Sequence, residues 1–323
     1  MKTIYIESFA DNPLMKPNPQ ISWMSSNILN CGVVFDEEAK KWAWNGIGGR
    51  KWIMLFGTSG EQSKFSLGLA LSQNGQNWEI VLKESVSGNS FNKYCQGNIE
   101  NLRIIKWPDG WYYVFATMKS SFNDFCLGLW KTKDFFRFKW VMIPFEKPIY
   151  NAAIFPEMIG NRAYLIYQKN SDFLISKTRD RTLKKDWENN QTLIEKEKFL
   201  KNFVGSNQFS EIRLVAPPIK TPRGWLVFSH LVDNTESPKK AYYLSFLVLN
   251  FFEPEKVEYI HSEPIFCLAL KQEKEIFEPM TCFVNSVVDP GVWSSFLYFY
   301  WREAENFICG GKIAKNQFPM CYP

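Results

Sequence analysis

The 323-residue sequence contains only two histidines, His230 and His261, and its seven cysteines are scattered without one C-x-x-C pair. Clustered His and Cys side chains are the usual ligands of a structural zinc ion, so we expect neither a metal nor a cofactor. The odd number and wide spacing of the cysteines predict reduced, buried thiols in a cytoplasmic protein rather than a disulfide framework.

Long apolar runs and a strong charge of one sign are also missing. No window approaches 18 uninterrupted apolar residues, and residues 1–7 lack the basic start and apolar run of a secretory signal. The net charge is only +5, and the lysine-rich segment 182–201 mixes both signs. We therefore expect a protein that binds neither nucleic acid nor a membrane.

Aromatic residues, in contrast, make up 17% of the chain, and they recur in short runs of β-branched and aromatic character. The five runs are 51–57, 110–116, 161–168, 224–230 and 296–301. This composition is typical of buried strands. After each of the first three runs, a second strand and a polar turn follow, and Trp78, Trp140 or Trp187 then begins a returning strand. The polar turns contain Asn74-Gly75, Asp134 and Asp180, and Asn-Gly is a strong hairpin signal.

An upstream strand is predicted before each run, at 31–36, 99–105, 152–159, 215–221 and 283–289. The repeated unit is thus three or four antiparallel strands, used about five times, and radial stacking buries both faces of such sheets. We predict an all-β fold, a five-bladed β-propeller of antiparallel four-stranded blades, with residues 1–323 as one domain. A pair of β-sandwiches is the alternative, and 193–203 is the one segment predicted to be helical.

In a propeller the innermost strands converge on the central axis. Polar side chains within those apolar strands need partners, and they are therefore the first candidates for a site. These residues are Asn30, Glu100, Asn101, Arg103, Asn151, Glu157 and Asn285. His230 ends a core strand and joins them, whereas His261 is interpreted as a surface residue.

The order of the motifs resembles that of glycoside hydrolase family 130, the mannoside phosphorylases and β-mannosidases, which are five-bladed propellers. "ENLR" (100–103) resembles the family's Glu-Asp-Pro-Arg, and "NAAIFPEM" (151–158) resembles its Lys-Asp-Ala-x-x-Phe-Pro-Glu segment. The most specific block is "PPIKTPRGWLVFSH" (217–230), and the resemblance extends from about residue 27 to residue 313. It implies that an oligosaccharide, a β-mannoside-type glycan, is bound in the central funnel.

Several positions that carry the family's chemistry differ in this sequence. The resemblance assigns the general acid to the position of Asn101, and an amide has no proton to donate near neutral pH. Asn151 also replaces an aspartate, while Gln168 and Gly57 stand where phosphate-binding arginines are expected. Of the phosphate-site residues that the resemblance implies, His230 remains. A phosphate dianion needs several positive donors, so these changes argue against phosphorolysis.

Hydrolysis with inversion would need two carboxyl groups about 6.5–9.5 Å apart. The acidic residues at matched or neighbouring positions are Glu100, Glu157, Glu211 and Glu278. Glu211 has two open interpretations: a new base with Arg213 as its partner, or half of a salt bridge that fills a former pocket. Glu157 is either a sugar contact or a buried carboxylate bonded to backbone.

The resulting candidate set has two parts. The catalytic candidates are Asn101, Glu211 and Glu157, and the substrate-binding candidates are Asn30, Glu100, Arg103, Asn151, Gln168, His230, Tyr242 and Glu278. Three functions stay open: a glycosidase-like enzyme, a glycan-binding relative without activity, and a scaffold propeller. The sequence indicates neither the sugar nor an oligomeric state.

Overall fold

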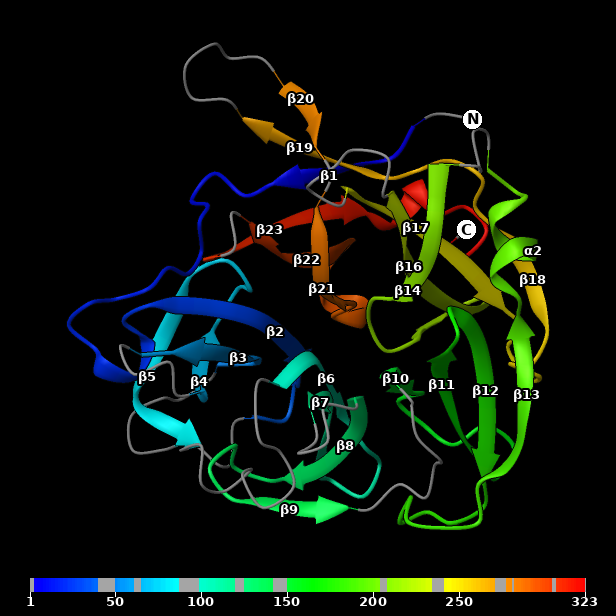
Figure 1. Cartoon of the computed structure of the whole chain (residues 1–323), viewed down its shortest axis with the longest axis horizontal. Helices are drawn as coiled ribbons and strands as arrows, with labels where there is room; N and C mark the ends of the chain where they lie inside the picture. Colours follow the sequence, from blue (N-terminus) through cyan, green and yellow to red (C-terminus); the bar gives the residue numbers. More distant parts are fainter. Residues whose placement is uncertain are drawn as a thin grey trace.

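The computed structural model describes residues 3–39, 50–60, 65–86, 99–119, 125–141, 150–203, 208–233, 241–270, 277–280, 282–303 and 306–322. Their strands form five antiparallel sheets placed around one centre, with a single parallel pairing at the edge of the last sheet (Figure 1). The predicted five-bladed β-propeller is confirmed.

The first three blades are four-stranded meanders in which each strand pairs with the next. Blade 1 holds β2 (Asn27–Phe35), β3 (Trp52–Ser59), β4 (Phe65–Ser72) and β5 (Trp78–Val86). Blade 2 holds β6 (Ile99–Lys106), β7 (Tyr112–Lys119), β8 (Phe125–Thr132) and β9 (Phe138–Val141). Blade 3 holds β10 (Tyr150–Ile154), β11 (Ala163–Lys169), β12 (Asp172–Thr178) and β13 (Glu188–Ile194).

Blades 4 and 5 depart from this pattern. Blade 4 holds β14 (Phe209–Leu214), β16 (Gly224–Asp233), β17 (Ala241–Leu249) and β18 (Val257–Ile260), and the short β15 (Ile219–Thr221) pairs with the start of β16. Blade 5 holds β21 (Phe283–Val288), β22 (Phe296–Glu303) and β23 (Phe307–Ala314). Its next strand is β1 (Tyr5–Ser8), antiparallel to β23, followed by β19 (Phe266–Leu270) and β20 (Phe277–Met280). The N-terminal strand therefore closes the ring.

One predicted inner strand is wrong. The inner strand of blade 4 is β14, whose Phe209, Ile212 and Leu214 are buried, and not the segment 215–221. That segment contains Pro217 and Pro218, which have no N–H to donate to a ladder.

Helices are few in the described part of the chain. The predicted helix at 193–203 shortens to α2 (Lys196–Leu200), because the first two residues of that segment belong to β13. The 3₁₀ turns are η1 (Ser22–Met24), η4 (Gly291–Trp293) and η5 (Lys315–Gln317). Within the described ranges, no helix combines the length and apolar character needed to cross a bilayer.

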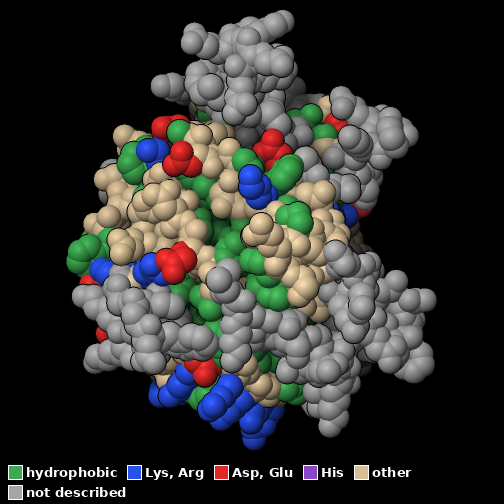
Figure 2. Space-filling view, turned by 90° about the vertical axis from the view of Figure 1, so that its left-hand side faces the viewer, with side chains coloured by type: hydrophobic (Ala, Val, Ile, Leu, Met, Phe, Trp, Pro, Cys, Tyr) green, Lys and Arg blue, Asp and Glu red, His purple; other side chains and the backbone are tan. Residues whose placement is uncertain are grey.

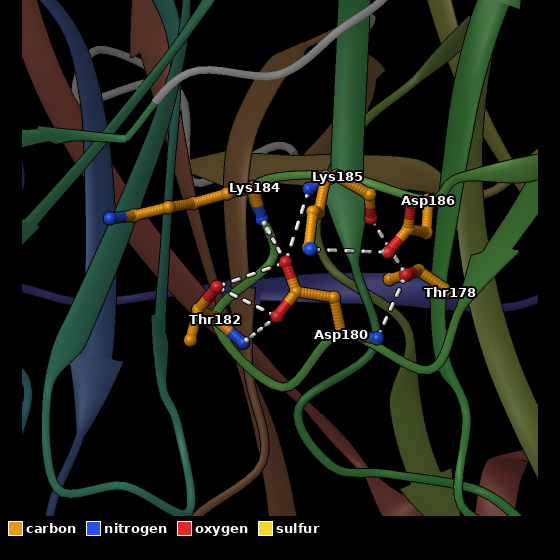
Figure 3. Close-up of polar contacts among 6 residues, drawn as sticks. All are labelled: Thr178, Asp180, Thr182, Lys184, Lys185 and Asp186. Atoms are coloured by element: carbon orange, nitrogen blue, oxygen red, sulfur yellow. Dashed lines mark hydrogen bonds and ion pairs between the residues drawn. The ribbon is translucent and has the colours of Figure 1, made fainter.

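The predicted polar turn between the third and fourth strands recurs in blades 1 to 3. In blade 1 the Ser72 hydroxyl accepts a hydrogen bond from the backbone N–H of Gly75 (2.9 Å), and Asn74 Oδ1 accepts two more from the following backbone. The positions of Ser72 and Asn74 are taken in blade 2 by Thr132 and Asp134, and in blade 3 by Thr178 and Asp180. Figure 3 shows the carboxylate of Asp180 accepting bonds from this turn. Side chains therefore satisfy the backbone donors that the tight reversal leaves unpaired.

Aromatic side chains of neighbouring blades pack against each other in the described part of the chain. Phe155 of blade 3 lies edge-on to Trp225 of blade 4, with ring centroids 5.0 Å apart, and Phe228 of blade 4 meets Phe299 of blade 5 at 5.3 Å. The face shown in Figure 2 mixes apolar side chains with both charges, and Lys and Arg gather at its lower edge. Side chains of both signs are therefore present among the described residues of that face.

The cysteines follow the prediction only in part. Cys31, Cys309 and Cys321 are free and buried, but Cys282 is disulfide-bonded. The expectation of reduced thiols is wrong at Cys282, because sequence spacing does not reveal which thiols the fold brings within bonding distance.

Candidate functional site

The register of each innermost strand shifts at one comparable point, where an extra residue bulges out. The shifts lie after Ile28 in β2, Glu100 in β6, Tyr150 in β10, Phe209 in β14 and Val284 in β21. Asparagine occupies four of these bulges, as Asn30, Asn101, Asn151 and Asn285. A bulge re-aims its side chain, and asparagine tolerates the positive φ found at Asn101 (54°) and Asn151 (51°).

Hydrogen bonds join these asparagines across blades into what we call the hub. Its members are Asn30, Asn101, Arg103, Thr117, Asn151, Gln168, His230 and Asn285. On one side, Asn285 Nδ2 donates to Asn30 Oδ1 (3.3 Å). On the other, the Thr117 hydroxyl accepts from Asn101 Nδ2 and from the backbone N–H of Asn151, both at 3.4 Å. The structure thus brings together most of the predicted polar residues of the inner strands.

Gln168 connects blade 3 to blade 4. Its side chain is 1% exposed. Its Oε1 accepts from Asn151 Nδ2 (2.8 Å) and the backbone N–H of Leu214 (2.9 Å), while Nε2 donates to the carbonyl of Ile212 (2.6 Å). Both polar atoms of the amide are therefore engaged in holding β14 against β11.

Arg103 is a buried cation bonded to backbone carbonyls. Its Nη1 donates to the carbonyls of Leu102 (3.1 Å) and Asn285 (3.3 Å), and its Nη2 donates to that of Leu214 (3.0 Å). Nε has no partner among the described residues. Burial lowers the pKa of Arg103 to about 9, so the guanidinium stays charged at neutral pH. It ties blades 2, 4 and 5 together rather than projecting into solvent.

His230 performs a similar role between blades 4 and 5. Its Nε2 accepts a hydrogen bond from the backbone N–H of Val284 (3.0 Å), and its ring stacks on Phe283 at 5.1 Å. Burial, with added repulsion from Arg103 and Arg213, lowers the pKa of His230 to about 3. The imidazole is therefore neutral at physiological pH, with Nε2 as an acceptor.

Glu211 lies on β14, two residues before the register partner of His230. Its Oε2 accepts from Nε (2.9 Å) and Nη2 (2.7 Å) of Arg213, and both side chains are 29% exposed. Arg213 pairs with His230 in the β14–β16 ladder, and its guanidinium lies 5.8 Å from the ring centre of Tyr242. The ring of Tyr242 lies 5.6 Å from that of His230. The Glu211–Arg213 pair predicted from sequence therefore forms beside the hub.

Two of the other acidic candidates, Glu157 and Glu278, lie elsewhere. Glu157 follows β10 and bonds Lys220 of β15 (2.6 Å) with a side chain 39% exposed, so it is not a buried carboxylate. β15 pairs with the start of β16, whereas His230 lies seven positions into that strand's ten residues, so the structure does not unite Glu157 with the hub. Glu278 lies on β20, at the opposite end of its sheet from β21, and its side chain is outside the described residues.

Two further positions complete the comparison. Glu100 is exposed and pairs with Thr117 across the β6–β7 ladder, next to Asn101. Gly57 is buried in β3, and a Cβ placed there would lie 3.1 Å from the Phe65 ring and 3.3 Å from Leu29. A larger residue at position 57 would require its neighbours to move.

Sequence reasoning missed Thr117, whose hydroxyl joins Asn101 to Asn151. The signal that could have identified it is a polar residue inside the apolar strand β7. Among the described residues, no group of three His, Cys, Asp or Glu side chains is arranged to hold a metal ion.

A family profile described as "beta-1,4-mannooligosaccharide phosphorylase" matches residues 28–298, a range that contains most of β2 and the innermost strands of the other four blades. The chain belongs to glycoside hydrolase family 130. It is 24% identical over 317 residues to a 1,2-beta-oligomannan phosphorylase of Thermoanaerobacter sp. (strain X514), covering 94% of this chain and 96% of the relative. It is also 24% identical over 311 residues to a beta-1,2-mannobiose phosphorylase of the same organism, covering 95% and 97%.

Solved family 130 structures share the fold. The beta-1,2-mannobiose phosphorylase of Listeria innocua, bound to beta-1,2-mannobiose, superposes with a TM-score of 0.73 at 18% identity, covering 98% of this chain and 99% of that one. A structure from work on family 130 hydrolases that target beta-1,2 mannosidic linkages in Candida mannan gives a TM-score of 0.74 at 13% identity, covering 98% and 95%. The profile match confirms the predicted family 130 membership.

Proposed function

We propose that this family 130 propeller binds β-1,2-linked mannosides, or a closely similar β-mannoside glycan, at the hub and does not catalyse phosphorolysis. The two curated relatives are phosphorylases named for β-1,2-linked mannosides, which supports the ligand class. Hub asparagines supply uncharged donors and acceptors of the kind that sugar hydroxyls pair with.

The engagement of Gln168 and His230 carries the argument against phosphorolysis. The family resemblance places phosphate contacts at both positions, yet Gln168 is neutral and bonds blade 4, while His230 is a neutral acceptor. Arg103 is bonded to three carbonyls, and Arg213 is paired with Glu211. These groups do not supply the set of free positive donors that a phosphate dianion needs.

Asn101 argues against the usual proton transfer. Its amide cannot protonate a leaving oxygen, and such transfer is typically worth about 10²–10⁴ in rate. Hydrolysis with Glu211 as base is the second candidate, because the Glu211–Arg213 pair lies beside His230 in the ladder.

The test combines binding with turnover. The protein is incubated with β-1,2-mannobiose, with and without phosphate, and thermal shift and released sugar are measured. We expect a thermal shift without release of mannose or mannose 1-phosphate. Asn101→Asp is expected to gain hydrolysis by about 10²-fold, and the matched Asn101→Ala variant to gain none.

Adding Glu211→Gln to Asn101→Asp should abolish the gain if Glu211 is the base. Release of mannose 1-phosphate by the unaltered protein would refute the absence of phosphorolysis. No thermal shift at millimolar mannobiose would refute glycan binding and favour a scaffold propeller.

A further inference from the structure

A cavity of about 600 Å³ lies apart from the hub, where the two ends of the described chain meet blade 4. Its volume is within the usual range of about 300–1,000 Å³ for small-molecule sites. We call it the seam cavity, and its lining residues are Ile4, Phe246, Tyr259, His261, Asn316, Gln317, Pro319 and Met320. Ile4 directly precedes β1, Phe246 belongs to β17, and the last four follow β23. The cavity shares no residue with the hub.

His261 lies in the wall of the seam cavity with an unused nitrogen. The side chain is 4% exposed, so its interpretation as a surface residue is wrong. The ring stacks on Phe246 at 4.6 Å and 15°, and Nδ1 lies 3.3 Å from the Tyr259 hydroxyl. Nε2 has no hydrogen-bond partner among the described residues. A buried polar atom without a partner is unfavourable, and a hydrogen bond from a ligand hydroxyl would satisfy it.

The charge of the lining indicates the class of ligand. None of the eight lining residues is acidic, lysine or arginine. Burial lowers the pKa of His261 and so favours the neutral imidazole; Glu263 acts in the opposite direction, and the N-terminal ammonium lowers the pKa further. The eight described lining residues therefore include no charged side chain that would pair with an anionic ligand.

The remaining chemistry is a mixture of apolar surface and uncharged hydrogen-bonding groups. Asn316 and Gln317 are exposed at the C-terminal side of the cavity and offer two carboxamides. The ring of Tyr259 and the side chains of Ile4 and Met320 supply apolar surface. A ligand that matches both has several hydroxyl groups and an apolar face, which describes a pyranose sugar.

We propose that the seam cavity is a second, non-catalytic carbohydrate site that takes one or two neutral hexose units. The site goes beyond the proposed function of the hub and does not depend on it. Its ligands would bond the amides of Asn316 and Gln317, cover the apolar wall and lie against His261, whose Nε2 lacks a partner among the described residues.

The two-histidine composition makes this testable by NMR of the full chain. Imidazole signals are recorded in ¹⁵N-labelled protein during titration with mannose, glucose or β-1,2-mannobiose, and His261→Phe assigns them while keeping the stack on Phe246. We expect the His261 signals to shift saturably by about 10 mM sugar, which is ten times a 1 mM dissociation constant.

The double variant Asn316→Ala/Gln317→Ala alters exposed residues only and is expected to weaken this response at least about tenfold, the equivalent of 1.4 kcal/mol. Asn101→Ala, a hub variant, should leave it unchanged. Unmoved His261 signals with all three sugars would overturn the proposal. An equal response to inorganic phosphate would overturn the assignment to neutral ligands. Failure of hub binding alone would leave the His261 response intact, so the two proposals can fail separately.

Discussion

The neutral, buried state of His230 should make the protein lose stability as the pH falls. Its imidazole has a pKa of about 3 in the folded chain, against 6.5 for an exposed histidine. Between pH 6.5 and 3, the imidazole is therefore protonated in the unfolded chain but neutral in the folded chain. The stabilising contribution is present above pH 6.5 and is lost as the pH falls toward 3. A pH of 5.0 lies about 1.5 units below the unfolded pKa. At 1.36 kcal/mol per unit, protonation there stabilises the unfolded state by about 2 kcal/mol.

The measurement is urea unfolding at pH 7.5 and 5.0 for the unaltered chain and for His230→Gln. Gln places a neutral acceptor near the position of Nε2, so it can accept the Val284 N–H without titrating. Other groups titrate in both proteins and cancel in the difference. We expect the unaltered chain to lose about 2 kcal/mol more than the variant between the two pH values. Equal losses, within about 0.5 kcal/mol, would refute a neutral buried His230.

Three further outcomes can be measured by thermal or urea unfolding. Gln168→Ala should cost about 2–4 kcal/mol, because it leaves buried backbone groups of blade 4 without partners; a loss under about 1 kcal/mol would contradict that role. Gly75→Ala should cost more than Gly110→Ala, because both have positive φ but only at Gly75 would a Cβ lie 2.9 Å from the Tyr300 hydroxyl; equal costs would show that contact to be unimportant. Glu157→Gln should change stability by less than about 1 kcal/mol and leave mannobiose binding unchanged, since it loses a part-exposed ion pair away from the hub.

The blade count was predictable because a short aromatic strand recurs in every blade. In blades 1 to 3 a polar turn and a returning tryptophan also follow it, at a spacing that can be read from the sequence. Blade 4 misled the prediction because its inner strand lies upstream of a proline pair that resembles a family motif. The apolar residues Phe209, Ile212 and Leu214, interleaved with polar ones, were the better indicator of that strand.

The hub was predictable as a set of polar residues but not as an arrangement. Polar residues inside apolar strands pointed to Asn101, Asn151 and Arg103. The bulges that re-aim them, and the bonds of Gln168 and His230 to another blade, depend on contacts between segments far apart in sequence. Local patterns contain no information about such contacts, so positions expected to face a ligand proved to join the blades.

The strand β1 has a consequence for how the protein is made. Tyr5 pairs with Phe266 and Glu7 with Lys312, so β1 emerges from the ribosome before all five blades and has no ladder partner until blade 5 follows. Until then both edges of β1 stay unpaired, and such edges invite pairing with other chains. The ring therefore cannot close until blade 5 has been synthesised. A short N-terminal deletion that removes β1 would take away the strand that closes it.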